Sequence, residues 1–247
     1  MIHPDIREYS AVCSVTGQNH MLSEDRYRML SRDIPLVARS LRGEVFAVFD
    51  GIGSTPRGRE AAQVMADCLL LFYRQPQKYP ASPEGIWALL MEANLIIHGW
   101  GFMDKEKLRP IGGAAGTVVW LFKDVLNIFQ AGDTEAFVIR DQQTVAHTQV
   151  HQLDDGAIYR YFGMGPTLKS EICTYNIEEG DQILLASDGL TKLCDIDEIE
   201  SIVANYPNTG RAVTELVKMA IKKGSKDDIT VLMVEVEELW DDNRGNE

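Results

Sequence analysis

Residues 45–53, VFAVFDGIG, form an apolar run that ends abruptly in Asp-Gly. The pattern returns at 182–190, QILLASDGL, where Asp188 follows the run. A third run, ITVLMVEV at 229–236, begins directly after the acid pair Asp227-Asp228. Short runs of β-branched and aromatic residues bounded by glycine predict buried strands. Because a carboxylate at the end of a buried strand is costly unless its charge is balanced, the three junctions predict a shared site for hard cations such as Mg²⁺ or Mn²⁺.

The composition is that of an acidic globular protein. Of 247 residues, 45% are hydrophobic, which permits a full core in one domain or two. The formal net charge of −13 argues against a nucleic-acid-binding surface, which needs a basic patch. The four cysteines lack CxxC spacing, and no stretch has a signal-peptide pattern or the length of a membrane span. We therefore expect a cytoplasmic monomer with reduced thiols that binds neither nucleic acid nor membrane.

Helices and strands are predicted in separate blocks along the chain. Four helices are expected from helical apolar spacing and start signals, at 60–73, 84–100, 195–205 and 211–223. A meander of strands joined by short turns, which makes its neighbours antiparallel, is expected at 117–122, 125–130 and 136–139. Stretch 141–180 lacks periodicity and suits substrate-facing loops. This order predicts an α+β fold, with one domain over 1–237 and a short acidic tail over 238–247.

The candidate site residues are acids spread along the chain, and each alone has a plainer interpretation. An Asp-Gly after a strand, as at Asp50 or Asp188, is usually a turn. The adjacent Glu24 and Asp25 suit a solvated turn or a helix cap, and Asp133 suits a hairpin between two strands. The combination, with apolar strands attached to most of these acids, favours metal chemistry.

The ordered motifs resemble the metal-dependent serine/threonine protein phosphatases, known as the PPM family or protein phosphatase type 2C, and especially their compact bacterial members. The resemblance spans nearly the whole chain, from about residue 17 to residue 236. It rests on SEDR (23–26), FAVFDGIGS (46–54) with GREAA (58–62), GAAGTVV (113–119), FQAGDTEAFVIRD (129–141), ILLASDGL (183–190) and SKDDITVLMV (225–234). It implies a four-layer α/β/β/α sandwich of two mainly antiparallel sheets flanked by pairs of helices.

The resemblance also implies roles for the acids. Asp50 would bridge two Mn²⁺ or Mg²⁺ ions, and Gly51 would offer its backbone carbonyl. Asp188 and Asp227 would complete the ligand set of the first ion. Together with Asp50 they are the predicted catalytic residues. Glu24 would bind the second ion directly or through water, and Asp25 would contact metal-bound water. Asp133 and Asp188 resemble the pair that binds a third, weaker ion in bacterial relatives.

The implied reaction is hydrolysis of phosphoserine and phosphothreonine in proteins. Two metal ions would lower the pKa of a bridging water, and the hydroxide would attack phosphorus in line with the leaving oxygen. No covalent phosphoenzyme and no nucleophilic cysteine or histidine is needed. The implied partners are phosphorylated proteins, the targets of a serine/threonine kinase, in a signalling role.

The sequence departs from the family pattern around the phosphate. His20 stands where an arginine often binds the substrate phosphate, and it suits either a weaker phosphate contact or a surface turn. Arg26 or Arg57 could replace the arginine, although each also suits a solvated surface charge. Ile52 stands where some members carry a histidine proposed as general acid, and Asp228 where asparagine is usual, either to strengthen metal binding or to cap the strand.

Two alternatives stay open at this point. The loss of the arginine at His20 motivates a catalytically weak relative that acts as a phosphoprotein-binding regulatory module. A narrower alternative keeps the enzyme but directs it to a dedicated regulator, such as an anti-sigma-factor antagonist.

Overall fold

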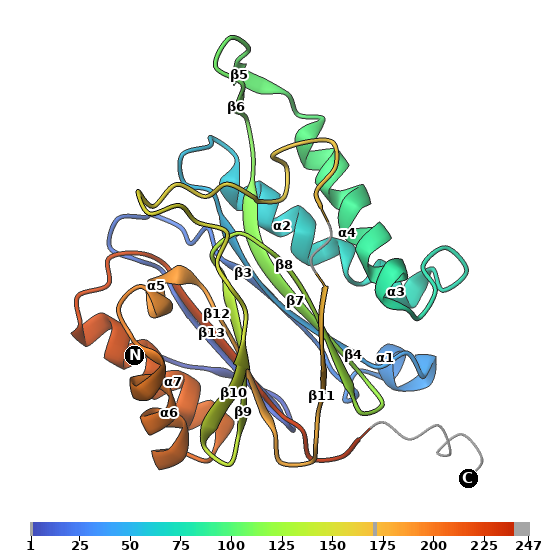
Figure 1. The fold of residues 1–247 in the computed structure, drawn as a ribbon, viewed down its shortest axis with the longest axis vertical. Coiled ribbons are helices and arrows are strands. Elements are labelled where there is room, and N and C mark those ends of the chain that lie inside the picture. Colours follow the sequence, from blue (N-terminus) through green and yellow to red (C-terminus); the bar gives the residue numbers. More distant parts are fainter. Residues whose placement is uncertain (1, 170–171, 240–247) are drawn as a thin grey trace.

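The computed structural model describes residues 2–169 and 172–239. Within them, two antiparallel sheets lie face to face, and helices cover the outer face of each sheet (Figure 1). This arrangement confirms the predicted α+β class and the four-layer α/β/β/α sandwich. The proposed domain boundary at residue 237 stays a prediction, and residues 240–247 of the predicted tail lie outside the described residues.

Each sheet is named here after one central strand. In the β13 sheet the strands lie in the order β1 (Asp5–Ile6), β2 (Ser10–Val15), β13 (Ile229–Glu235), β12 (Gln182–Ala186), β9 (Glu135–Arg140) and β10 (Gln143–His147). In the β4 sheet they lie in the order β11 (Ile172–Asn176), β8 (Val125–Ala131), β7 (Ala114–Phe122), β4 (Glu44–Gly51) and β3 (Arg26–Leu30). All these neighbours are antiparallel.

The predicted three-stranded meander is wrong in one respect. β7 and β8 pair as expected, but β9 pairs with β10 and β12 in the other sheet. The chain crosses between the sheets in the short connection after Ala131, where Gly132 takes a φ of 115°, a conformation that side-chain-bearing residues rarely adopt. Asp133 therefore lies in the connection that joins a strand of one sheet to a strand of the other, rather than in a hairpin within one sheet.

Helices cover both outer faces. The β4 sheet carries α1 (Pro35–Ser40), α2 (Gly58–Cys68), α3 (Leu71–Arg74) and α4 (Pro83–His98). The β13 sheet carries α5 (Asp188–Thr191), α6 (Ile196–Asn205) and α7 (Thr209–Lys222). The helix predicted at 60–73 is interrupted after Cys68, whereas the predicted start of α4 is confirmed, because the Ser82 side chain accepts the Gly85 N–H. None of the helices in the described ranges is long and apolar enough to cross a bilayer.

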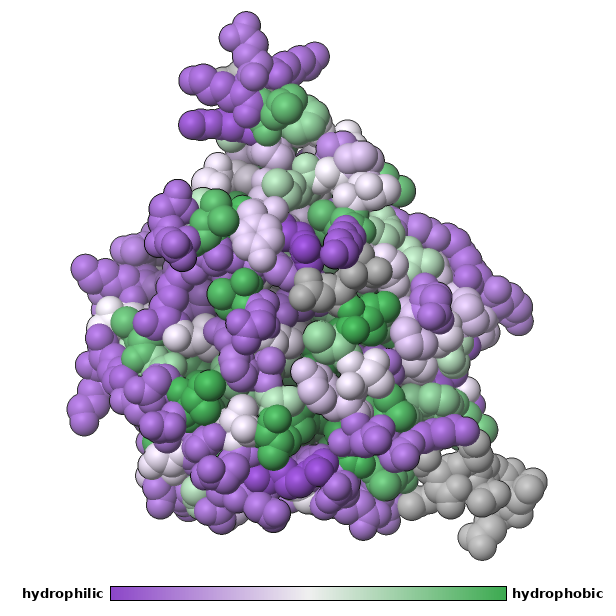
Figure 2. All heavy atoms as spheres, in the orientation of Figure 1, coloured by the Kyte–Doolittle hydropathy of each residue, from purple (hydrophilic) through white to green (hydrophobic). Residues whose placement is uncertain are grey.

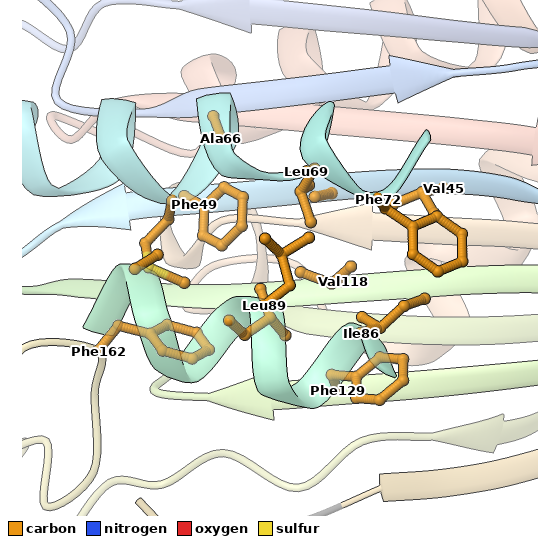
Figure 3. Close-up of a cluster of buried hydrophobic side chains, with 14 of the residues drawn as sticks. Val45, Phe49, Ala66, Leu69, Phe72, Ile86, Leu89, Val118, Phe129 and Phe162 are labelled. Carbon is orange, nitrogen blue, oxygen red and sulfur yellow. The ribbon is translucent and has the colours of Figure 1, made fainter. Parts of the chain in front are cut away.

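The central strands are buried on both faces, which explains their continuous apolar runs. Along β4, Phe46 and Val48 point between the sheets, whereas Val45 and Phe49 point toward α2 and α4. Figure 3 shows this outer layer, where side chains of the β4 sheet meet those of the two helices. The alternation leaves the ends of the strands as the places where polar residues reach the surface.

One unpredicted hairpin stands apart from the sandwich. β5 (Phe102–Asp104) pairs with β6 (Arg109–Pro110), and the hairpin projects beyond the end of α4 (Figure 1). Hydrophilic residues gather on it in Figure 2, in keeping with its exposed tip Lys105–Lys107. Its sequence, FMDKEKLRP, alternates too little to have marked two strands.

Candidate metal centre

The acid-tipped strands end at the same side of both sheets. β4 ends beside Asp50, Asp188 follows β12, and Asp227 lies just ahead of β13, whose first residues pair with the last of β12. A cavity of about 450 Å³ opens there. The predicted site residues on its wall are His20, Glu24, Asp50, Gly51, Asp133, Asp188 and Asp227. Residues more than 200 positions apart are thus brought to one site.

Asp25 lies behind this wall and is buried. Its Oδ2 accepts a hydrogen bond from the Ser187 hydroxyl at 2.8 Å, and the same hydroxyl accepts the Thr230 N–H at 2.9 Å. Its other oxygen, Oδ1, is buried and has no hydrogen-bond partner among the described residues. The same holds for Oδ1 of Asp188. A buried carboxylate oxygen without a donor is expensive, so both point to a ligand that supplies positive charge.

Two glycines beside the acids allow close backbone approach. A Cβ on Gly189 would lie 2.0 Å from the carbonyl oxygen of Asp228, and one on Gly51 would lie 2.4 Å from the carbonyl carbon of Gly58. Neither residue is among the glycines with positive φ. These glycines are therefore needed for space between neighbouring segments rather than for a left-handed backbone conformation.

The crowding of carboxylates raises their affinity for protons. Burial, followed by the charges of Asp25, Asp188 and other acids of the site, raises the pKa of Asp50 well above its usual value. Burial and the charge of Asp188 likewise raise the pKa of Asp133 to about 6, although the nearby Lys192 ammonium acts in the opposite direction. Burial also raises the pKa of Asp227. The site therefore has a surplus of negative charge.

The donor set fits hard divalent cations. Carboxylates and a backbone carbonyl are the oxygen ligands that Mg²⁺ and Mn²⁺ prefer, and two of the carboxylates have orphaned buried oxygens. Within the described residues, no three His, Cys, Asp or Glu side chains already converge on one point. The acids line the cavity wall instead, so a cation would have to draw them closer together.

The loop that carries His20 is held by Asp228. The Asp228 carboxylate is buried and accepts the N–H of Gly17 at 2.7 Å through Oδ1, and the N–H of Glu24 at 2.7 Å through Oδ2. His20 Nδ1 also lies 2.9 Å from Oδ2. The hydrogen bond to Asp228 raises the pKa of His20. Asp228 is not among the residues on the cavity wall and acts as a loop anchor, which the sequence did not indicate.

The two arginines considered for the phosphate lie elsewhere. The Arg26 side chain donates to Gln63 at 2.6 Å and to the carbonyl of Ser23 at 2.9 Å. The Arg57 guanidinium stacks over the Trp100 ring, 3.8 Å from its centroid. Neither is among the residues that line the cavity. Of the three candidates for the phosphate, the structure brings only His20 to the acids.

Part of the stretch between β10 and β11 lines the cavity, and its predicted role as a substrate-facing loop stays a prediction. Gln152, Gly156–Ile158 and Tyr161 line the wall. The buried Asn94 of α4 anchors this stretch, since its side chain accepts the Gly163 N–H at 2.7 Å and donates to the Gly165 carbonyl at 2.9 Å.

Lys192 was also missed, and its side chain reaches the cavity from the end of α5 and pairs with Asp188. Its position four residues after Asp188 could have indicated a shared helix face. Asn94 has no comparable signal.

Sequence comparisons find similarities to known proteins. A family model described as Stage II sporulation protein E (SpoIIE) matches residues 117–237. A Mycoplasma pneumoniae protein named "Putative protein phosphatase" is 24% identical over 90% of this chain and 98% of its own.

Solved structures share the fold. One, a bacterial serine phosphatase, superposes with a TM-score of 0.77 at 18% identity, over 92% of this chain and 97% of the other. Another is the catalytic domain of the serine/threonine protein phosphatase PstP in complex with two manganese ions, with a TM-score of 0.73 at 18% identity over 96% and 100%. The chain therefore shares the fold of PPM serine/threonine phosphatases, and the SpoIIE match covers just under half of it.

Proposed function

We propose that this protein hydrolyses phosphoserine and phosphothreonine in protein substrates with Mn²⁺ or Mg²⁺ bound at the carboxylate-lined cavity. The observation that carries the proposal is the meeting of Asp50, Asp133, Asp188 and Asp227 on one wall. When bound, two cations would supply positive charge for the phosphoryl oxygens and an activated water. The PstP catalytic domain, with its two manganese ions, supports this assignment.

The proposed role of each site residue follows from the sheet to which it belongs. Asp50 and the Gly51 carbonyl would hold cations from the β4 sheet, and Asp188 and Asp227 would hold them from the β13 sheet. Glu24 extends the ligand set along the wall, while Asp25 lies behind it, with one oxygen fixed by Ser187. This division assigns the carboxylates to binding and orientation, so none of them has to form a bond to phosphorus.

His20 is the proposed contact for the substrate phosphate. Among the described residues that line the cavity, only His20 and Lys192 can carry positive charge, and Lys192 is already paired with Asp188. Because Nδ1 of His20 faces Asp228, Nε2 is the ring nitrogen left to meet a ligand. Leaving-group protonation would fall to His20 or to water, since Ile52 has no proton to give.

The test is a metal-titrated assay on an aryl phosphate and on phosphoserine and phosphothreonine peptides. Activity should require Mn²⁺ or Mg²⁺, stop in chelator, and disappear in Asp50→Asn and Asp227→Asn. Asp124→Asn, a change of the same kind at an exposed turn outside the cavity, should behave as wild type. Equal turnover in chelator or in the two site variants would refute the metal-dependent mechanism.

The binding-module alternative is not favoured, because the cavity wall keeps the core carboxylates. It would require phosphopeptide binding with negligible hydrolysis at saturating Mn²⁺. A kinase-linked substrate, a cytoplasmic location and a monomeric state stay predictions, and the choice of one dedicated substrate rests on assays of candidate phosphoproteins.

A further inference from the structure

Lys192 places an ammonium group inside the acidic cavity. Its side chain leaves the end of α5, four residues after Asp188, and Nζ pairs with Oδ2 of Asp188. The Lys192 side chain keeps 52% exposure, whereas that of Asp188 keeps 9%. The contact therefore joins a half-exposed cation to a nearly buried carboxylate, a pair that solvent screens less than an ordinary surface ion pair.

The two oxygens of Asp188 have different surroundings. Oδ2 is engaged by Lys192, whereas Oδ1 is buried without a hydrogen-bond partner among the described residues. Oδ1 is thus the oxygen open to a cation at the core of the site, and Oδ2 is already balanced. Asp188 can serve a core cation and Lys192 at the same time.

Asp133 belongs to the same group of charges. Asp133 and Lys192 both line the cavity beside Asp188, where burial and the charge of Asp188 raise the pKa of Asp133 and the charge of Lys192 lowers it. Oδ2 of Asp133 also lies 3.4 Å from the amide nitrogen of Gln152. The positive charge of Lys192 already offsets part of the negative charge of Asp133 and Asp188. A divalent ion beside these two carboxylates would therefore be attracted less strongly, and the Lys192 ammonium would repel it.

We propose that Lys192 is a built-in cation that takes the place of a third metal ion at the Asp133–Asp188 pair. The inference rests on the proposed metal-dependent function, since it concerns how many ions that site accepts. Lys192 acts through Asp188 and is a positioning residue. It fixes the orientation of Asp188 and limits the site to two ions.

The experiment counts bound ions without substrate. Wild type, Lys192→Met, Lys192→Arg and the control Lys222→Met are stripped of metal with chelator, and free Mn²⁺ is followed by electron paramagnetic resonance as Mn²⁺ is added. Lys222 is an exposed lysine on α7 that does not line the cavity. Wild type, Lys192→Arg and Lys222→Met should bind two ions. Lys192→Met should gain a third, with affinity for that ion raised roughly tenfold or more by loss of the repelling charge.

A double variant locates the added ion. Lys192→Met combined with Asp133→Asn should return to two ions. A third ion on wild type, or an unchanged count in Lys192→Met, would overturn the role of Lys192 while leaving the metal-dependent function intact. No Mn²⁺ bound by wild type would overturn both. Circular dichroism checks folding, and Lys192→Gln replaces Lys192→Met if the latter fails to fold, with the same expected gain.

Discussion

The Asp228→Asn variant tests whether the loop carrying His20 and Glu24 depends on a carboxylate that accepts from two sides. In the wild type, Oδ1 accepts the Gly17 N–H and Oδ2 accepts the Glu24 N–H, both at 2.7 Å. Asparagine has nearly the same shape but only one acceptor oxygen. In either orientation its NH₂ group faces a backbone N–H, so one donor loses its partner.

The expected cost follows from this mismatch. A part-buried donor left without an acceptor costs about 1–3 kcal/mol, and the remaining hydrogen bond loses its charge assistance, a further contribution of about 1 kcal/mol. Removing a negative charge beside Glu24 and Asp227 relieves repulsion by about 1 kcal/mol. The net loss is about 2 kcal/mol, which lowers the melting midpoint of a protein of this size by roughly 4–8 °C.

Salt separates the two effects in the melting assay. Repulsion is screened at high ionic strength, whereas the mismatch of donors is local. Asp228→Asn should therefore lose more stability relative to wild type in about 0.5 M salt than in low salt. The control Asp124→Asn removes the same charge from an exposed turn and should melt with wild type. An Asp228→Asn midpoint within about 1 °C of wild type at both salt concentrations would refute the anchor.

Three further outcomes are expected. Asp50→Asn should lower Mn²⁺-dependent turnover by roughly 10³-fold and yet raise the metal-free melting midpoint, because it removes one of the crowded charges; a lower metal-free midpoint would contradict the crowding. Gly189→Ala should cost about 3 kcal/mol in denaturant unfolding, since its Cβ would lie 2.0 Å from a backbone oxygen, whereas Gly165→Ala, with its nearest contact at 3.7 Å, should be nearly neutral. Burial raises the pKa of the Cys13 and Cys194 thiols to about 11, so stability should be full below about pH 8.5 and fall as the pH rises toward 11. Cys13→Ala should flatten that fall, and an equal slope in both proteins would exclude the thiol as its cause.

The sequence was most informative where burial acts on both faces of a strand. The runs that became β4, β12 and β13 are apolar throughout because each is covered by a sheet on one side and by helices on the other. The acidic residues at the ends of these strands were therefore expected either to form turns or to bind metal. β3 was missed because its sequence, RYRML, carries two arginines in an edge strand with a partly exposed face.

The rest of the site depended on side-chain direction, which spacing does not specify. Arg26 begins β3 close to Asp25, yet its guanidinium turns to Gln63 and away from the cavity. The arrangement of β8 and β9 likewise depended on a crossing at Gly132 that a short connection alone could not distinguish from a hairpin.

The acids of the cavity come from two separate sheets, and this origin links metal supply to the lifetime of the protein. Under the proposed function, a cation held between Asp50 and Asp188 would cross-link the halves of the sandwich in the folded chain alone. At a free concentration one hundred times its dissociation constant, such a ligand would stabilise folding by about 2.7 kcal/mol. In a cell short of manganese, the activity of each molecule would then fall because its site lacks metal. The amount of this phosphatase would fall as well, because more chains unfold and are degraded by proteases.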